Sequence, residues 1–133
     1  MRKDRKMRGF TLVELLIVLL ILSVLNGLAV PRYLTAVEAS RKTTFCSNVR
    51  NVMSALEMYR IYEGSEQYPA SDTALTPSII NNPNYFSKPP INPYTGKVME
   101  PATSTAVKGS FTYTASTLPE YYTIETNPDC DLQ

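Results

Sequence analysis

Apolar side chains fill the chain from Phe10 to Val30 almost without a break, and Glu14 is the one ionisable side chain among them. A helix over this stretch is about 31 Å long at about 1.5 Å per residue, which matches a bilayer hydrocarbon core of about 30 Å. The pattern predicts that residues 10–31 form the membrane-spanning half of a long helix.

The pattern changes to that of an amphipathic helix over residues 32–62. Polar and charged side chains alternate there with apolar ones that recur every three or four residues, as expected where one face packs on a protein core. The whole helix is predicted to run from about Thr11 to Ile61, before Gly64 and Pro69 end it. The apolar stripe consists of Phe45, Val49, Val52, Met53, Leu56 and Tyr59.

The junction between the two halves is a weak point of the predicted helix. Pro31 has no amide hydrogen to bond the Gly27 carbonyl, and Asn26 and Gly27 are poor helix formers. The sequence therefore predicts a kink or a local opening of the backbone there.

Residues 63–133 are predicted to form a small globular head. The segment 65–93 is rich in Pro, Asn and Ser and is typical of an ordered loop. Within it, a short helix is expected near 72–80, with Ser71 or Asp72 as its N-cap.

Alternating apolar positions predict three strands, at 97–99, 111–115 and 121–125. The pair Lys108-Gly109 is expected to turn the chain into the second of them. The fold class predicted is α+β, in which a long N-terminal helix packs against a small antiparallel sheet.

Positive charge is concentrated at the N-terminus. Residues 1–9 contain five basic side chains and one acidic side chain. By the positive-inside rule, this segment stays in the cytoplasm and the rest of the chain lies outside. Without it, eight basic and eleven acidic side chains remain, a net charge of −3. Nothing basic enough to bind nucleic acid is left.

Glu14 carries an energetic cost in this apolar context. An acid at a helix centre costs about 2.5–3.5 kcal/mol on the insertion scale, but the surrounding aliphatic side chains outweigh it, so the segment should still insert. Two explanations are open. The carboxylate lies near enough to the interface to reach water, or it receives a cationic partner later.

The motif GFTLVE at positions 9–14, with a basic leader before it and an apolar helix after it, resembles the class III signal of type IV pilins and pseudopilins. The resemblance implies that residues 1–9 are a leader. By the same resemblance, a membrane-embedded prepilin peptidase would cut between Gly9 and Phe10 and N-methylate Phe10. The resemblance also implies that Glu14 pairs with the amino terminus of an adjacent subunit, and Pro31 stands where the family carries a proline.

The same resemblance implies a homopolymer joined through its N-terminal helices, with residues 10–31 as its core. A cytoplasmic assembly ATPase and a membrane platform would drive assembly. An ordinary secretory signal peptide is the competing interpretation of the N-terminus, and it predicts cleavage before Val30.

The two cysteines, Cys46 and Cys130, suit a location outside the cytoplasm, where thiols oxidise. A bridge between them would close a loop of roughly 84 residues, worth about 4.5 kcal/mol in the chain-entropy model. Two free thiols are the alternative. Many type IV pilins carry both cysteines in the C-terminal half, so a cysteine on the helix is a departure from that pattern.

The sequence contains no histidine, and no phosphate-binding loop, nucleophile elbow or cysteine-pair metal motif. No catalytic residue, enzyme activity or cofactor is predicted. Asp129 and Asp131 are weak calcium candidates, because calcium takes six to eight oxygen ligands.

The leading hypothesis is a structural subunit of a type IV pilus-like filament. It is anchored in the cytoplasmic membrane before assembly and then lies at the cell surface or in the periplasm. One alternative is a pseudopilin of a type II secretion or competence system. A second is a membrane-tethered extracellular binding module, for which Glu14 would be dispensable.

Overall fold

The structure of the protein is a computed structural model that describes residues 9–62, 67–117 and 120–132. The basic leader up to residue 8 and the expected helix-ending Gly64 lie outside the described residues. The chain divides into two compact units, the first ending at Glu38 and the second beginning at Ala39.

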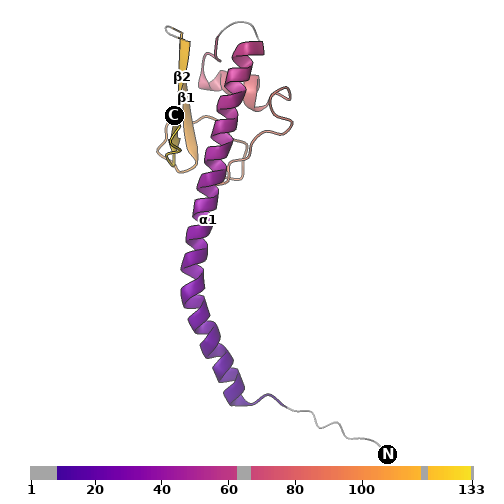
Figure 1. The fold of residues 1–133 in the computed structure, drawn as a ribbon, viewed down its shortest axis with the longest axis vertical. Helices are drawn as coiled ribbons and strands as arrows, with labels where there is room; N and C mark the ends of the chain where they lie inside the picture. Colours follow the sequence, from indigo (N-terminus) through magenta and orange to yellow (C-terminus); the bar gives the residue numbers. More distant parts are fainter. Residues whose placement is uncertain (1–8, 63–66, 118–119, 133) are drawn as a thin grey trace, which may run out of the picture. The chain divides into compact units, whose positions relative to one another are not determined.

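One long helix, α1, spans Leu12–Tyr62 and belongs to both units (Figure 1). Its bounds lie within one residue of those predicted. The sequence predicts a kink or a local opening near Pro31. The opening does not occur, because the backbone stays helical from Asn26 through Pro31, and the kink stays a prediction. A proline removes a single hydrogen bond, and the turns on either side hold the backbone in place.

Two short helical segments follow the long helix, α2 (Asp72–Leu75) and η1 (Thr76–Ile80), the latter a π-helix. They confirm the helix predicted near 72–80. The N-cap is Ser71, whose hydroxyl accepts a hydrogen bond from the Ala74 amide at 3.2 Å. A serine oxygen at this position satisfies an amide that has no partner inside the helix.

The sheet is an antiparallel hairpin of β1 (Ser110–Thr117) and β2 (Glu120–Asn127). Its register pairs Ser110 with Asn127 at one end. These strands confirm the predictions at 111–115 and 121–125.

The third predicted strand, at 97–99, is wrong, because only a single bridge joins Ile91 and Val98. Asn92 explains the difference. Its buried side chain donates to the Gly109 carbonyl at 2.6 Å and accepts from the Tyr94 amide at 3.0 Å, which closes a turn directly after the bridge.

Gly109 makes the predicted turn into β1 at a φ of 84°. A Cβ at this position would lie 2.7 Å from the Cβ of Tyr94, so a larger residue would push the two loops apart.

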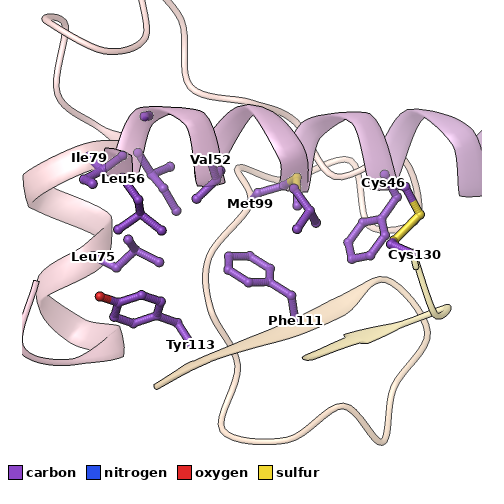
Figure 2. Close-up of a cluster of buried hydrophobic side chains, with 13 residues drawn as sticks. Cys46, Val52, Leu56, Leu75, Ile79, Met99, Phe111, Tyr113 and Cys130 are labelled. Atoms are coloured by element: carbon purple, nitrogen blue, oxygen red, sulfur yellow. A yellow bond between two sulfur atoms is a disulfide. The ribbon is translucent and has the colours of Figure 1, made fainter. Parts of the chain in front are cut away.

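The core of the second unit forms where one face of α1 meets β1 and the α2–η1 segment (Figure 2). Phe111 and Tyr113 point from β1 toward the helix, and Leu75 and Ile79 close one side. The α+β class is therefore confirmed. The buried members are Phe45, Cys46, Val49, Val52, Ala55, Leu56, Leu75, Ile79, Ile80, Met99, Phe111, Tyr113 and Cys130.

Candidate functional site

The first half of α1 is exposed on every side. Each described side chain from residue 9 to residue 36 is exposed, and the large apolar ones range from 45% exposed at Val18 to 82% at Phe10. Within the described residues, α1 is the single helix long and apolar enough to cross a membrane, with a mean hydropathy of 2.6 in its most apolar window. A continuous apolar surface of this kind needs lipid or other helices around it.

Glu14 lies in the first turn of α1, where Thr11 and Glu14 form a reciprocal pair. The Thr11 amide and the Thr11 hydroxyl both donate to Glu14 Oε2 at 2.9 Å, and the Glu14 amide donates to the Thr11 hydroxyl at 3.2 Å. This is the capping-box arrangement, in which the N-cap residue and the third helical residue satisfy each other's free donors. The carboxylate also lies at the positive end of the helix dipole.

Sequence reasoning treated Glu14 as an isolated acid and missed this partner. The signal was available, because Thr followed three positions later by Glu, directly before an apolar run, is the sequence form of a capping box. The carboxylate therefore has a local partner before any second chain approaches.

Ser23 adds little polarity to the apolar surface. Its hydroxyl donates to the Leu19 carbonyl at 2.7 Å, one turn back along the same helix. A hydroxyl folded onto the helix in this way does not need a partner from outside.

Gly9 and Phe10 lie just before α1, outside any helix or strand, and both are exposed. The peptide bond between them is therefore not shielded by the described part of the chain. Pro31 is exposed and lies within the helix, where its carbonyl accepts a hydrogen bond from the Thr35 hydroxyl at 3.0 Å.

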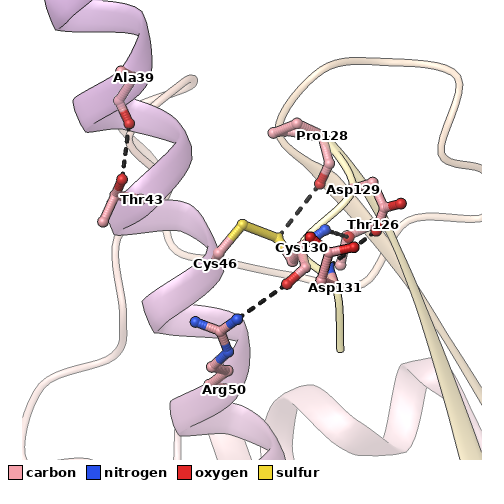
Figure 3. Close-up of a disulfide and its surroundings, with 9 residues drawn as sticks. All are labelled: Ala39, Thr43, Cys46, Arg50, Thr126, Pro128, Asp129, Cys130 and Asp131. Atoms are coloured by element: carbon pink, nitrogen blue, oxygen red, sulfur yellow. Dashed lines mark hydrogen bonds between the residues drawn. A yellow bond between two sulfur atoms is a disulfide. The ribbon is translucent and has the colours of Figure 1, made fainter. Parts of the chain in front are cut away.

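A disulfide joins Cys46 on α1 to Cys130 in the C-terminal tail (Figure 3). Both cysteines are nearly buried, at 6% and 4% exposed. Arg50, one turn further along the helix, donates to the Cys130 carbonyl at 3.1 Å, and the Cys130 amide donates to the Thr126 hydroxyl at 3.1 Å. The tail is thus fixed to the helix by one covalent bond and one charge-assisted hydrogen bond.

The calcium candidates lie beside this disulfide. Asp129 Oδ1 accepts a hydrogen bond from the Asp131 amide at 3.1 Å, which is a local turn contact. Within the described residues, no three Asp, Glu, His or Cys side chains gather closely enough to hold a metal ion.

The N-terminal segment matches a family model described as the prokaryotic N-terminal methylation motif, over residues 4–29. Type II secretion system core protein G of Pseudomonas aeruginosa is 27% identical over 101 residues, which cover 68% of this chain and 70% of the relative. The chain belongs to the type IV pilin and pseudopilin family.

Two further members of this family bear the same name. Core protein G of Dickeya chrysanthemi is 30% identical over 95 residues, 71% of this chain and 60% of the relative. The protein of Escherichia coli K12 is 34% identical over 83 residues, 62% of this chain and 55% of the relative. The chain thus spans less than two thirds of these two relatives. No solved structure matches the chain.

The similarities change the order of the functional hypotheses. All three relatives carry the name of a secretion-system core protein and none that of an enzyme. They favour the pseudopilin alternative over the surface pilus that the sequence analysis placed first. At the level of the family, the leading hypothesis of a pilin-type chain is retained.

Proposed function

We propose that this chain is a pseudopilin, a filament subunit of a type II secretion system. The observation that carries this proposal is the extent of the similarity to core protein G. The methylation motif covers residues 4–29 alone, whereas the similarity to the Pseudomonas protein extends over 101 residues and therefore includes part of the head. A shared leader signal by itself does not separate pilins from pseudopilins.

Processing would come first. A membrane-embedded peptidase would hydrolyse the peptide bond between Gly9 and Phe10, releasing the basic leader and a new amine on Phe10. Transfer of one methyl group to that amine would leave it cationic when protonated. The exposed position of both residues ahead of α1 supports this step.

Assembly would then depend on the first turn of α1. The new cationic amine of one subunit would approach Glu14 of its neighbour. Two opposite charges about 4 Å apart gain about 4 kcal/mol at an effective dielectric constant of 20. The hydrogen bonds from Thr11 hold Glu14 Oε2, and the second carboxylate oxygen has no hydrogen bond within the described residues. Glu14 would therefore fix the register of neighbouring helices.

In this proposal residues 10–31 form the core of the polymer, residues 32–62 support the head, and the head faces outward. The subunit would wait in the cytoplasmic membrane with its N-terminus inside, and the assembled filament would extend outside that membrane. The exposed apolar surface of α1 supports both states, because lipid and neighbouring helices cover it equally well. An assembly ATPase and a membrane platform would supply the work.

Mass spectrometry of the mature N-terminal peptide tests the processing step. We expect a peptide that begins at Phe10 and carries one methyl group. A peptide that begins at Val30 would support a secretory signal instead, and a retained leader would contradict processing altogether.

Gene deletion and the Glu14→Ala variant test the role. Deletion should stop secretion of exported enzymes and leave surface fibres in place, whereas loss of fibres with normal secretion would indicate a type IV pilus. Glu14→Ala should insert in the membrane normally but fail to polymerise. Normal polymerisation of this variant, or a monomer that functions without Glu14, would contradict the assembly model and favour a tethered binding module.

A further inference from the structure

The two edges of the β1–β2 hairpin differ. The Phe111 carbonyl accepts a hydrogen bond from the Ala102 amide at 2.7 Å, so the backbone groups of Phe111 point away from β2. At the same end, the Asn127 carbonyl accepts from the Gly109 amide, so Asn127 points toward β1. In an antiparallel pair this direction alternates residue by residue.

Thr126 pairs with Phe111, so its N–H and C=O point away from β1, and so do those of Ile124 and Tyr122. In the described part of the chain, no hydrogen bond joins the backbone of these three residues to any other residue. The outer edge of β2 therefore presents a row of backbone donors and acceptors of the kind that pairs with another strand.

The face of the hairpin that packs on the core is also less covered along β2. Phe111 and Tyr113 of β1 are 1% and 5% exposed, whereas Ile124 and Tyr122 beside them on β2 are only half-buried. A cavity of ≈ 390 Å³ borders this edge and is lined by Thr105, Ile124, Glu125, Thr126, Asp129 and Leu132. The cavity leaves room for a further extended segment beside residues 124–126 of β2.

The charge at this edge is negative. Glu125 and Asp129 both line the cavity and are exposed, and no lysine or arginine lines it. Asp129 also borders a second cavity with Lys42 and Arg50, so Glu125 is the acid that belongs to this edge alone. A segment lying along β2 would be favoured if it carried positive charge.

We propose that the outer edge of β2 binds an extended, lysine- or arginine-bearing segment of another polypeptide, which adds to the hairpin as a third strand. Backbone hydrogen bonds to Tyr122, Ile124 and Thr126 provide the binding, and Glu125 selects the charge. This inference goes beyond the proposed function, although the exclusion of a second copy rests on it. A second copy joined through the same edge would need a two-fold axis, which subunits following one another along a polar helical filament do not have.

Hydrogen exchange of the full chain in detergent micelles tests the inference. The probes are three short acetylated peptides of alternating Val and Thr: one with flanking lysines, one with flanking glutamates, and one with lysines and N-methylated backbone amides. The lysine peptide should slow exchange at the Tyr122, Ile124 and Thr126 amides by about tenfold or more, because exchange then requires release of the added strand. The other two should leave exchange unchanged.

Charge reversal supplies a second readout that keeps the backbone edge intact. Glu125→Lys should reverse the preference, so that the glutamate peptide protects the three amides. Glu100→Lys makes the same change at an exposed site beside a different cavity and should leave the preference as it was. Ile124→Pro, which removes one outward N–H, should abolish protection by either peptide.

The inference is wrong if the lysine peptide leaves all three amides unprotected in the parent chain. Equal protection by the N-methylated peptide would also overturn it, because strand addition needs those amides. Protection that grows with protein concentration in the absence of peptide would assign the edge to a second copy and would overturn the choice of partner.

Discussion

The two compact units divide α1 into a first half that ends at Glu38 and a second half that begins at Ala39, and the two halves cover their apolar side chains in different ways. From Ala39 onward the helix buries one face, at Phe45, Val49, Val52 and Leu56, against its own head. Before Glu38, the apolar side chains surround the helix and none of them is buried within the described residues. A stripe with helical period can be covered by one partner inside the chain, whereas an apolar surface without a period needs partners on all sides.

The second half of α1 should therefore determine the stability of the head, and the first half should determine assembly. Each large apolar side chain buried in the second half contributes about 1.5–3 kcal/mol to the folding of the head. The first half contributes its burial only when lipid or neighbouring subunits surround it. Substitutions in the two halves should therefore alter different measurements.

Removal of the disulfide should give the largest loss of head stability, because the bridge joins the second half of α1 to the C-terminal tail. Replacing Cys46 and Cys130 together by serine removes a cross-link between residues 84 positions apart. The chain-entropy model assigns about 4.5 kcal/mol to such a loop, so the urea midpoint of head unfolding should fall steeply. Near-ultraviolet circular dichroism of the tyrosines in detergent reports the unfolding.

The helix of the first half should keep its far-ultraviolet signal in the same double variant. A control, Ser47→Ala, lies beside the bridge at an exposed site and should leave the midpoint unchanged. If the double variant unfolded at the parent midpoint, the tail would contribute nothing to the head, contrary to the contacts of Cys130.

A matched pair of leucines should give the next largest effect on the free energy of unfolding of the head. It also compares the two halves of α1 most directly. Leu56 is 0% exposed and Leu16 is 58% exposed on the same helix. Leu56→Ala leaves a cavity in the head and should cost about 2–5 kcal/mol of unfolding free energy. Leu16→Ala should leave that free energy unchanged within about 0.5 kcal/mol and weaken polymerisation instead. Equal effects on the head would contradict the division of α1.

Much of this division could be predicted from the sequence, because it rests on local patterns. The helix bounds, the Ser71 cap and the two paired strands follow from periodicity and from residue chemistry within a few positions. The end of α1 at Tyr62 lies one residue beyond the predicted Ile61, and that prediction rested on two nearby helix-ending residues, Gly64 and Pro69.

The predicted strand at 97–99 is wrong because distant parts of the chain meet there. Lys97–Met99 reads as a strand, but the buried side chain of Asn92 reaches the Gly109 carbonyl and ends pairing after one bridge. No local pattern reveals a contact 17 residues away. The capping box at Thr11 is different, because Thr followed three positions later by Glu is a local signal that the sequence already contains.

Removal of the capping box should have a smaller effect, which is limited to amide exchange in the first turn of α1. Thr11→Val keeps the shape of the side chain and removes the hydroxyl that both donates to and accepts from Glu14. Loss of an N-cap costs about 0.5–2 kcal/mol, so amide exchange in the first turn of α1 should be faster while head stability is unchanged. Thr35→Val removes a hydroxyl inside the helix, where it caps no terminus, and should leave the first turn as it was.

The last prediction has no effect at neutral pH. It concerns the stability of the head under alkaline conditions, through Tyr113 of β1 and Tyr122 of β2. Partial burial raises the pKa of Tyr122 to about 12, and the negative charge of Glu57 and the nearby Tyr68 act in the same direction. Burial also raises the pKa of Tyr113, whose hydroxyl donates to the Pro69 carbonyl at 2.8 Å. In the unfolded chain both titrate near 10, so above that pH the folded head retains protons that the unfolded chain has lost.

The contribution of these two tyrosines to folding stability should therefore be constant below about pH 9 and fall as the pH rises from 10 through 12, because the unfolded state then binds fewer protons. Thermal unfolding followed at each pH measures this fall. Tyr122→Phe should reduce the alkaline slope and leave the helix signal of the first half unchanged throughout. A slope that Tyr122→Phe does not alter would mean that ionisation elsewhere controls the alkaline unfolding, and the tyrosines would then be ordinary packing residues of the head.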